Sequence, residues 1–402
     1  MSGQPHVLQV FQPKIGGVPR YAANLAHGLR AAGWRVTVAC PADAPVRHDL
    51  EAAGFQTLPL NAPRAPRPID DARAARKIAR WSRELGVSLI HGHSTKAGLL
   101  VALAGRNAGL PSVYTPHTWA FQMDAPLQVR AAYAVAERRL ARAFHAAVMT
   151  VSESERVAAH RWRVAPYGRV RVIRTGLPAI QTVDRYQARR RLGIDEDSVI
   201  AVWVGRVGAQ KRPEDLIPIA RAVAGKVTIA ALCAGLNGNG LADDLRDAGV
   251  HVVDPASTPA TVYAAGDIVL HTSQWESCPF VVLEAMMAGL PVAGYWVGGV
   301  PEQVRTGRTG FLVRRGDIEM LSQSVLALAT EPELRARLGE AARRRAGTVF
   351  NYHGMLDGVI DTYHEVLGPS GARWPIAAAP RDEAVIPAEP VALAASQRVA
   401  SG

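Results

Sequence analysis

Short apolar runs alternate with longer amphipathic segments along most of the chain. The runs are rich in valine, leucine and isoleucine, as in HVLQV (6–10) and DIVLHTS (267–273). The segments between them repeat apolar residues at the 3.6-residue period of an α-helix, as in ARAARKIARWSREL (72–85). Apolar strands separated by helices are typical of parallel sheets that helices cover on both faces. The pattern therefore predicts an α/β fold with Rossmann-like, doubly wound parallel sheets.

The alternation forms two series, one in each half of the chain. In the first half we expect strands near 6–10, 35–39, 56–60, 87–91, 112–115, 146–150 and 170–173, with helices chiefly near 18–32, 71–85, 96–108 and 128–144. In the second half we expect strands near 199–204, 227–232, 250–253, 267–271, 291–294 and 311–313, with helices near 213–223, 241–248, 259–265, 279–288, 301–305, 317–329 and 331–346.

The β-pattern stops in TGLPAIQTVDRYQARRRLG (175–193), where glycine, proline and polar residues take over. We place a hinge there, near 178–188, because a chain of 402 residues is long enough for two domains with a cleft between them. The expected domains are residues 1–180 and 181–350. Beyond them, alanine, proline and serine predominate, so residues 368–402 are expected to form a disordered tail.

The composition is that of a folded protein, with 48% hydrophobic and 20% charged residues, and a cytoplasmic location is expected. The start of the chain lacks the layout of a signal peptide, and no window approaches the roughly 18 charge-free apolar residues of a membrane-spanning helix. Cys40, Cys233 and Cys278 are far apart and lack C-x-x-C spacing, so neither a disulfide framework nor a zinc site is indicated. Asp195-Glu196-Asp197 lies in a polar loop and is not expected to bind metal.

The net charge of +11 is unevenly distributed. Residues 1–180 hold 24 lysines and arginines against 10 aspartates and glutamates, whereas residues 181–402 hold 22 against 25. A field of one sign attracts an anionic partner, such as acidic lipid headgroups or a phosphate-bearing acceptor. Arginine-rich, solvated helix faces are the alternative explanation. Nucleic acid is not expected as a partner, because no nucleic-acid-binding motif accompanies the charge.

The strongest cluster of candidate chemistry is SQWESCPFVVLEAMMAGLPVAG (273–294). A strand ends near Ser273 and a helix is expected to open at Ser277–Pro279, which would present free backbone amides and a positive dipole end to a diphosphate. Glu276 stands just before this helix, where it can accept hydrogen bonds from sugar hydroxyls. Glu284 lies among apolar residues, where ribose hydroxyls are candidate partners; the alternative is a carboxylate that reaches solvent or pairs with a structural arginine.

Two cations follow a strand in VWVGRVGAQKRPEDL (202–216). Arg206 offers a planar fork and Lys211 a point charge, a combination that suits an anionic leaving group on a glycine-containing loop. A pair of surface cations is the alternative for this segment taken alone.

In the first half, Gly16 and Gly17 follow the first strand and allow the backbone to approach a phosphate or sugar closely. They do not form the G-x-G-x-x-G dinucleotide motif, which disfavours hydride transfer. Candidate side chains also follow two later strands, where structural histidines are the common alternative. A zinc site is not favoured, because no cysteine or carboxylate is recognisable nearby. The candidates in these two segments are His91, His93, Lys96 and His117.

Taken together, these segments resemble the retaining glycosyltransferases of family 4, also called group 1 glycosyltransferases, which have the GT-B fold. The resemblance covers about residues 5–367 and includes the family's E-x7-E spacing at Glu276 and Glu284. The matching text is GG (16–17), HGHSTKAG (91–98), YTPHTWAF (114–121), GRVGAQKRPEDLI (205–217) and SQWESCPFVVLEAMMAGLPVAGYWVGGVPEQVRTGRTGFLV (273–313).

The resemblance implies an acceptor-side N-terminal domain and a donor-binding C-terminal domain, with a last helix near 351–367 that crosses back to the first. It implies that Arg206 and Lys211 hold the diphosphate, Glu276 the transferred sugar and Glu284 the ribose. It further implies roles for residues on both sides of the site. These are His117, Gly16 and Gly17 near the sugar and phosphate, and the backbone of Cys278, Pro279, Phe280 and Val281 along the diphosphate. His93, Lys96 and Ser277 are further candidate substrate-binding residues.

Three positions depart from the family pattern. Ser277 follows the first glutamate and Arg212 follows the lysine, where many members have glycine, so the donor's identity stays open. Thr175-Gly176 replaces the usual asparagine of the linker strand, a change we interpret as neutral.

The resemblance implies transfer of a hexose from a nucleotide diphosphate sugar, with a UDP-sugar as the first candidate, with retention of configuration and without a tightly bound metal or cofactor. The implied acceptor is a lipid-linked or polysaccharide precursor, which agrees with peripheral contact at an anionic inner membrane surface. Two rival functions are a nucleotide-sugar epimerase of the same architecture and a sugar-nucleotide-binding protein without turnover.

Overall fold

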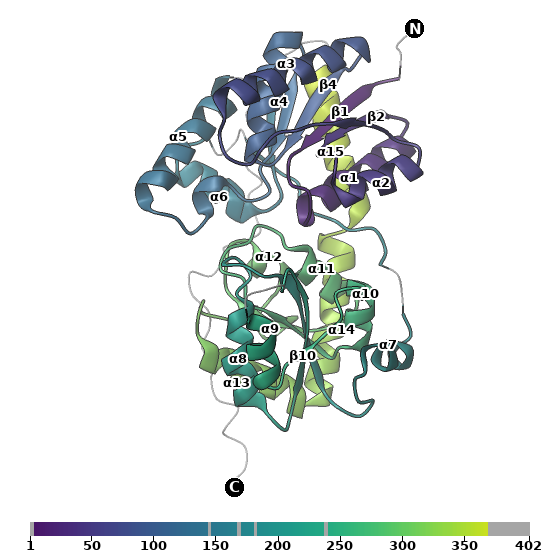
Figure 1. The fold of residues 1–402 in the computed structure, drawn as a ribbon, viewed down its shortest axis with the longest axis vertical. Coiled ribbons are helices and arrows are strands. Elements are labelled where there is room, and N and C mark those ends of the chain that lie inside the picture. Colours follow the sequence, from purple (N-terminus) through teal and green to yellow (C-terminus); the bar gives the residue numbers. More distant parts are fainter. Residues whose placement is uncertain (1–3, 144–145, 167–169, 181–182, 237–239, 369–402) are drawn as a thin grey trace. The chain divides into compact units, whose positions relative to one another are not determined.

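The structure is a computed structural model that describes residues 4–143, 146–166, 170–180, 183–236 and 240–368. The chain forms two compact units (Figure 1). The first comprises the residues up to Pro178 and a segment that begins at Asn351, and the second runs from Ala179 to Phe350. The tail expected at 368–402 lies outside the described residues, apart from Gly368.

The first unit is a parallel sheet with helices on both faces. Its elements are β1 (His6–Phe11), α1 (Gly17–Ala31), β2 (Arg35–Cys40), α2 (Pro45–Ala52), β3 (Gln56–Pro59), α3 (Pro68–Glu84), β4 (Leu89–His93), α4 (Thr95–Ala108), β5 (Ser112–Thr115), η1 (Ala120–Gln122), α5 (Leu127–Ala143), β6 (Ala147–Thr150), α6 (Glu153–Arg161), β7 (Val170–Val172) and α15 (Tyr352–Leu367). The sheet order is β3-β2-β1-β4-β5-β6-β7, so the winding reverses between β1 and β4.

The second unit repeats this architecture with a six-stranded sheet. Its elements are α7 (Arg185–Leu192), β8 (Ile200–Arg206), η3 (Pro213–Asp215), α8 (Leu216–Val223), β9 (Thr228–Ala234), α9 (Leu241–Asp247), β10 (His251–Val252), α10 (Pro259–Ala265), β11 (Ile268–His271), α11 (Phe280–Met287), β12 (Val292–Tyr295), α12 (Val300–Gln303), β13 (Gly310–Val313), α13 (Ile318–Thr330) and α14 (Pro332–Val349). The order β10-β9-β8-β11-β12-β13 reverses between β8 and β11.

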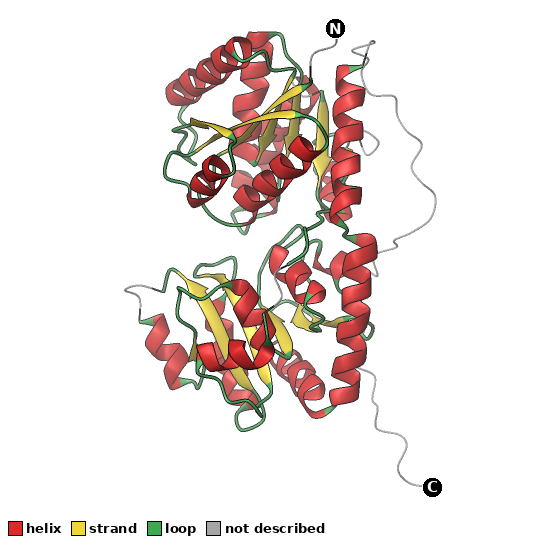
Figure 2. Cartoon of the chain, turned by 90° about the vertical axis from the view of Figure 1, so that its right-hand side faces the viewer, coloured by secondary structure: helices red, strands yellow, loops and turns green. Residues whose placement is uncertain are grey.

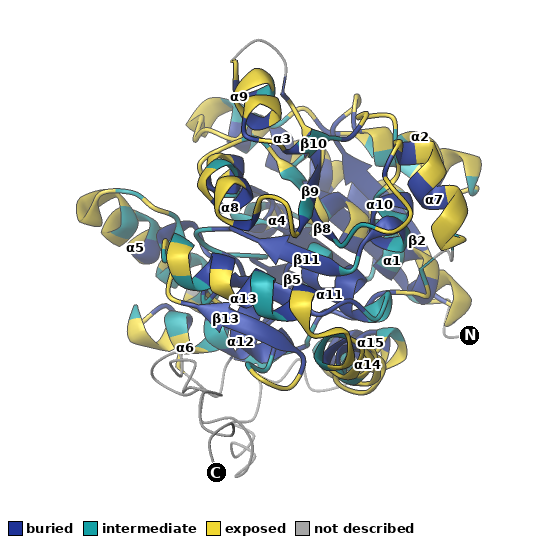
Figure 3. Cartoon of the chain, turned by 90° about the horizontal axis from the view of Figure 1, so that it is seen from below, coloured by how far each residue is buried: buried dark blue, intermediate teal, exposed yellow. Residues whose placement is uncertain are grey.

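Both sheets form through the burial pattern that the sequence predicts. Every residue of β1 and of β11 is buried, because helices cover both faces of the strands in each unit (Figure 2). Helix α1 buries one face, which includes Tyr21, Leu25 and Leu29. The central strands are accordingly dark blue and the outer helix faces yellow in Figure 3. The predicted fold, two Rossmann-like parallel-sheet units, is confirmed.

The element boundaries differ from the predicted ones in a few places. Strand β4 runs to His93, two residues beyond the predicted end at 91, so both histidines of this segment are strand residues. The segment at 175–193, interpreted as a polar linker, contains helix α7, which Asp184 caps by accepting a hydrogen bond from the Gln187 amide. Helix α7 escaped prediction because half of its residues are arginine and it has little apolar periodicity.

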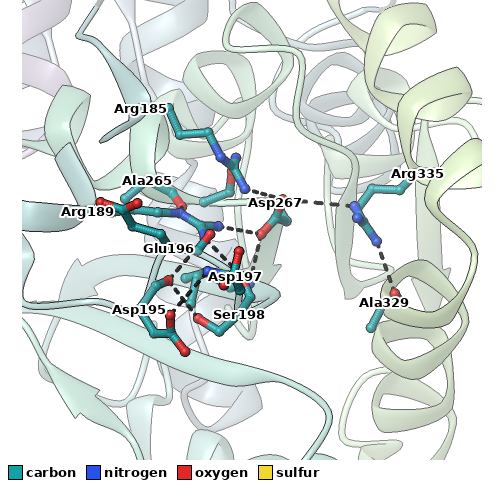
Figure 4. Close-up of polar contacts among 12 residues, drawn as sticks. Arg185, Arg189, Asp195, Glu196, Asp197, Ser198, Ala265, Asp267, Ala329 and Arg335 are labelled. Carbon is teal, nitrogen blue, oxygen red and sulfur yellow. Dashed lines mark hydrogen bonds and ion pairs between the residues drawn. The ribbon is translucent and has the colours of Figure 1, made fainter. Parts of the chain in front are cut away.

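A buried arginine attaches α7 to the second sheet. Arg189 donates to the Ala265 carbonyl at 3.1 Å and to carbonyl oxygens of the 195–198 loop, and it forms an ion pair with Asp267 at 2.9 Å (Figure 4). Asp267 also accepts from Arg185 and from the Ile200 amide. Backbone oxygens of Asp195, Glu196 and Ser198 therefore surround a buried guanidinium.

Helix α15 belongs to the first unit. The Tyr363 hydroxyl lies 2.6 Å from His91 Nδ1, and Arg171 of β7 donates to Thr362 and Glu365. At the start of this segment, a Cβ added to Gly176 would lie 2.3 Å from the Asn351 carbonyl oxygen. The glycine at position 176 is thus required by a close backbone approach.

Candidate functional site

In the second unit, the candidate residues gather where β8 and β11 lie side by side. Ligands of open α/β sheets bind beyond the carboxyl ends of the strands, at the point where the strand order reverses. Arg206 is the last residue of β8, and Lys211 lies in the loop that follows. Glu276 lies in the loop after β11. The topology therefore brings together two segments that are far apart in the sequence.

A shared hydroxyl joins the first of these loops to β11. Trp203 donates its indole N–H to the Thr272 hydroxyl at 2.9 Å, and that hydroxyl donates to the Lys211 carbonyl at 2.7 Å. Gly205 makes room for this arrangement, because a Cβ there would lie 2.6 Å from the Trp203 ring. The backbone of Lys211 is therefore fixed relative to the strand that precedes Glu276.

Hydrogen bonds around Gln210 join the two loops directly. The Gln274 amide donates to the Gln210 carbonyl at 2.8 Å. The Gln210 side chain in turn donates to the Trp275 carbonyl at 3.1 Å. These hydrogen bonds hold the two loops together at one edge of the sheet.

Lys211 and Glu276 form an ion pair at this edge. The Glu276 side chain is only 9% exposed. Burial raises the pKa of Glu276, but the lowering effects, led by the Lys211 ammonium, outweigh it, so the carboxyl is ionised at neutral pH. The sequence placed both residues at the site but did not predict that they pair with each other.

Two glycines hold the backbone of Glu276. Gly298 has a φ of 49°, and a Cβ there would lie 1.7 Å from the Glu276 carbonyl oxygen. The Gly299 amide donates to the same oxygen at 3.2 Å. Both glycines lie within residues 273–313, the segment that resembles the family, but no local pattern indicated a role for them.

The two remaining cations of this edge differ in conformation. Arg206 is exposed, and no hydrogen bond or ion pair of its side chain is found within the part of the chain that the structure describes. Arg212 has a left-handed backbone with a φ of 50°, and its side chain donates to Asp215 at 3.0 Å. The left-handed region favours glycine, which explains why glycine suits this position and why an arginine there is strained.

Helix α11 begins at Phe280, one residue after the predicted start, with Pro279 as its N-cap. Pro279 has no side chain that can cap, and its carbonyl accepts a hydrogen bond from Gln303 at 3.2 Å. The loop residue Ser277 is buried and Cys278 is half-buried. The positive end of this helix therefore lies directly after Glu276, as the sequence predicts.

Glu284 is buried inside α11, with 4% of its surface exposed. The Tyr263 hydroxyl of α10 donates to its Oε2 at 3.0 Å. The sequence indicated a ribose or an arginine as the partner of this carboxylate and did not indicate a tyrosine. The expected contact with ribose stays a prediction.

In the first unit, the candidates gather at the corresponding reversal between β1 and β4. Gly16 is the N-cap of α1 and has a φ of 105°, a value that favours glycine. Gly17 is the first residue of the helix, and a Cβ there would meet no atom within 4 Å. Both glycines are exposed, so this turn leaves open space beside the end of β1.

Three histidines converge beside this turn. The rings of His91 and His93 are 4.0 Å apart, and His93 Nδ1 lies 3.2 Å from His117 Nε2. Tyr21 of α1 packs edge-on against His117 at 4.5 Å. Burial lowers the pKa of His117 to about 3, and burial with the neighbouring histidines lowers the pKa of His93 well below its usual range. Both imidazoles are therefore neutral at physiological pH.

The loop that carries His117 is strained. His117 has a φ of 54° and Thr118 a φ of 96°, values that are uncommon for residues with a side chain and rare for a β-branched one. Buried Glu155 of α6 accepts hydrogen bonds from the amides of Thr118 and, at 2.9 Å, Val151. Strained backbone of this kind persists only where surrounding contacts enforce it, and it is concentrated at functional sites.

Lys96 is the candidate whose expected role the structure does not support. Its ammonium donates to both carboxylate oxygens of Asp71, at 2.7 and 2.8 Å, and to the Ala65 carbonyl at 2.9 Å. A lysine has three N–H donors, so all are engaged. Lys96 is a buried structural cation that attaches α4 to α3, and a substrate contact is not assigned to it.

Among the described residues, no group of three or more histidine, cysteine, aspartate or glutamate side chains is arranged to hold a metal ion, although the three histidines are close together. No helix within the described ranges is long and apolar enough to span a membrane.

The fold is shared with solved glycosyltransferase structures. HepE from Anabaena, solved in complex with UDP-glucose, superposes with a TM-score of 0.78 at 21% identity, over 90% of this chain and 99% of that chain. Sucrose-phosphate synthase from Thermosynechococcus elongatus gives a TM-score of 0.77 at 21% identity, with the same coverage. The two parallel-sheet units therefore have the GT-B fold.

Sequence comparison identifies the family. Residues 16–176 match the glycosyl transferase 4-like domain, and residues 184–345 match the glycosyl transferases group 1. The D-inositol 3-phosphate glycosyltransferase of Salinispora arenicola is 31% identical over 332 residues, which cover 73% of this chain and 72% of that relative. The chain belongs to the group 1 glycosyltransferases, and the resemblance found in the sequence is confirmed.

Proposed function

We propose that this glycosyltransferase moves a hexose from a nucleotide diphosphate sugar, with a UDP-sugar as the first candidate, and retains the anomeric configuration. The observation that carries the proposal is the cluster of Arg206, Lys211 and Glu276 at the reversal of the second sheet, beside the N-terminus of α11. A structure of the same fold was solved with UDP-glucose, which supports the choice of donor class.

Each group of this cluster matches one part of the donor. Arg206 and Lys211 would neutralise the diphosphate together with the backbone from Ser277 to Val281. Glu276 would accept hydrogen bonds from hydroxyls of the transferred sugar. Glu284 would bind the ribose hydroxyls while it keeps its hydrogen bond to Tyr263. No tightly bound metal is required, because the cations and the helix dipole supply the positive charge.

The first unit would supply neutral groups. His117 would act as a hydrogen-bond partner of the sugar, with His93 behind it and the Gly16-Gly17 turn beside the same group. A neutral imidazole can donate or accept a hydrogen bond without competing with the cations for the phosphates.

The reaction would be a displacement on one face of the sugar. The bond between C1 and the diphosphate oxygen breaks, and the bond between C1 and the acceptor oxygen forms. The acceptor proton passes to the departing diphosphate, so charge and atoms balance. We favour this course because no side chain of the site is a convincing covalent nucleophile.

The acceptor would be a lipid-linked or polysaccharide precursor, reached by peripheral contact with an anionic inner membrane surface. Helix α5 supports this proposal because its outer face exposes Leu127 at 67% and Val135 at 42% beside Arg139 and Arg142. Apolar side chains next to arginines suit an anionic bilayer surface. We expect binding to vesicles to rise with their content of acidic lipid.

A paired variant tests this surface. Replacing Arg139 and Arg142 by serine should weaken binding to acidic vesicles, as measured by co-sedimentation. Replacing Arg76 and Arg80 of α3 by serine removes the same charge elsewhere and serves as the control. Equal losses in both variants would show that only net charge matters.

The central experiment combines donor binding with product analysis. UDP-, GDP- and ADP-sugars are screened by thermal shift, and the stabilising donor is then supplied with lipid-linked, polysaccharide or sugar-phosphate acceptors. We expect a UDP-sugar to raise the Tm and the product to keep the donor's anomeric configuration. A new sugar formed from donor alone would indicate an epimerase. Donor binding with neither transfer nor hydrolysis would indicate a binding protein.

A further inference from the structure

His271 is a buried imidazole beside the donor cluster, and no role has been assigned to it so far. It is the last residue of β11 and is 3% exposed, yet neither ring nitrogen has a hydrogen-bond partner among the described residues. Buried polar side chains are nearly always hydrogen-bonded, and a group without a partner requires an explanation.

The Glu276 carboxylate lies just beyond hydrogen-bond distance of this ring. His271 Nε2 is 4.0 Å from Glu276 Oε1, which is the same oxygen that Lys211 contacts. Burial lowers the pKa of His271 to about 4, while Glu276 acts to raise it and Lys211 to lower it. The ring is therefore neutral and carries one N–H that can be donated.

Packing fixes the position of this residue. A Cβ added to Gly294 of the neighbouring strand β12 would lie 2.8 Å from both the Cβ and the carbonyl oxygen of His271. The two strands are paired in register at these residues. His271 thus stays at the edge of the site, and a small movement of the Glu276 carboxylate would close the 4.0 Å gap.

The ion pair creates a difficulty for donor binding. If Lys211 turns towards a diphosphate, the buried carboxylate of Glu276 loses its cation, and removing one partner of a buried ion pair is costly. A hydrogen bond with Ser273 also favours the ionised carboxyl, but a carboxylate has about four acceptor sites to satisfy. Glu276 needs another donor at that moment, and it must remain in place to bind the sugar.

We propose that His271 is a positioning residue. When Lys211 turns to the diphosphate, His271 replaces it as the hydrogen-bond donor to the Glu276 carboxylate. The Nε2–H of the neutral ring donates to Glu276 Oε1, and no proton is transferred. The inference rests on the proposed function, because it assigns Lys211 to the diphosphate and Glu276 to the sugar. Without a nucleotide sugar bound, Lys211 forms an ion pair with the Glu276 carboxylate, and the His271 ring has no hydrogen-bond partner among the described residues.

The proposal predicts a coupling between two residues. His271→Leu fills the buried space but removes the N–H. Binding of a nucleoside diphosphate should then leave the Glu276 carboxylate without a hydrogen-bond donor. We expect affinity to fall about tenfold, since one hydrogen bond to a charged group is lost. His271→Gln carries an amide N–H that can replace Nε2 and should restore most of the affinity.

The experiment is a titration of UDP, GDP and ADP into wild type, the two His271 variants and the same variants combined with Glu276→Gln. In the Glu276→Gln background no carboxylate is left behind, so His271→Leu should have no effect on affinity. The matched control is His251→Gln, a histidine of β10 at the edge of the same sheet, which should bind like wild type. Thermal unfolding shows that each variant is folded.

The outcomes distinguish a failure of the role proposed for His271 from a failure of the proposed function. Equal loss in both backgrounds would mean that His271 only supports the fold, and no loss in either would also overturn the inference. If His271→Leu does not fold, His271→Gln and His271→Asn decide, because only glutamine can reach with its amide as far as Nε2. If wild type binds none of the three diphosphates, the proposed function fails, and the inference falls with it.

Discussion

The two sheets reverse their winding in the same way, but they place different side chains at the reversal. At the β8–β11 edge, Lys211 and Glu276 are charged and paired, with Arg206 exposed beside them. At the β1–β4 edge, His93 and His117 are neutral and bonded to each other. The same sheet architecture therefore has a charged edge in one unit and a neutral edge in the other.

The difference teaches what each edge is suited to bind. A charged edge stabilises an anion that gains charge as a bond breaks, which is the demand of a departing diphosphate. A neutral edge orients hydroxyl groups without attracting the phosphates. The neutral edge depends instead on conformation, because Glu155 holds the strained residues His117 and Thr118 in place.

The sharpest way to break the comparison is to remove a cation. We expect Lys211→Ala or Arg206→Ala to lower the turnover of the donor about 100- to 1,000-fold, because each would remove stabilisation of the developing charge. Turnover is measured by release of the nucleoside diphosphate. Arg221→Ala on α8 is the control for loss of a positive charge from the same unit. Near-wild-type rates in both site variants would refute the claim that these cations stabilise the departing diphosphate.

Glu155 tests the neutral edge. We expect Glu155→Gln to lower kcat about tenfold, because the amide has one acceptor oxygen in place of two and the amides of Thr118 and Val151 both need one. The free energy of unfolding should fall by about 1–3 kcal/mol. Glu153→Gln on the same helix removes an equal charge and should have the smaller effect on kcat. If kcat falls equally in both variants, the strained conformation of the loop does not contribute to turnover.

The sequence was sufficient to predict the fold and the loops that hold the candidates. Apolar runs such as β1 and β11 have the pattern of buried parallel strands, and their carboxyl ends meet at one edge by topology. The sequence could not show that β8 and β11 are neighbours, because strand order is not encoded in local periodicity. The Lys211–Glu276 pair therefore became visible only in the structure.

Other residues were missed or misassigned for related reasons. Lys96 was expected at the substrate because a lysine after a strand looks the same whether it meets a ligand or Asp71. His271 ends an apolar strand and has no motif of its own. Gly298 is required by the Glu276 carbonyl oxygen, a contact between segments that only the fold brings together. Close backbone approaches and ion pairs between distant segments have no local signal.

The smallest expected effect concerns pH, and it tests whether the histidines are neutral. The pKa of His117 is lowered by burial to about 3, whereas the unfolded chain has the ordinary value near 6.5. Below pH 6.5 the unfolded state takes up a proton that the folded state does not. The stabilisation is thus complete above about pH 6.5 and is lost progressively as the pH falls towards about 3.

A single such histidine changes the free energy of unfolding by up to about 1.4 kcal/mol per pH unit in this range. We therefore expect His117→Gln to lose less stability than wild type between about pH 6.5 and 5.5, by about 1 kcal/mol. Denaturant unfolding at the two pH values measures the difference, and His251→Gln provides the control. An acid-side decline as steep in His117→Gln as in wild type would mean that His117 takes up its proton at the same pH in the folded and the unfolded chain, and burial would then not keep this edge neutral below about pH 6.5.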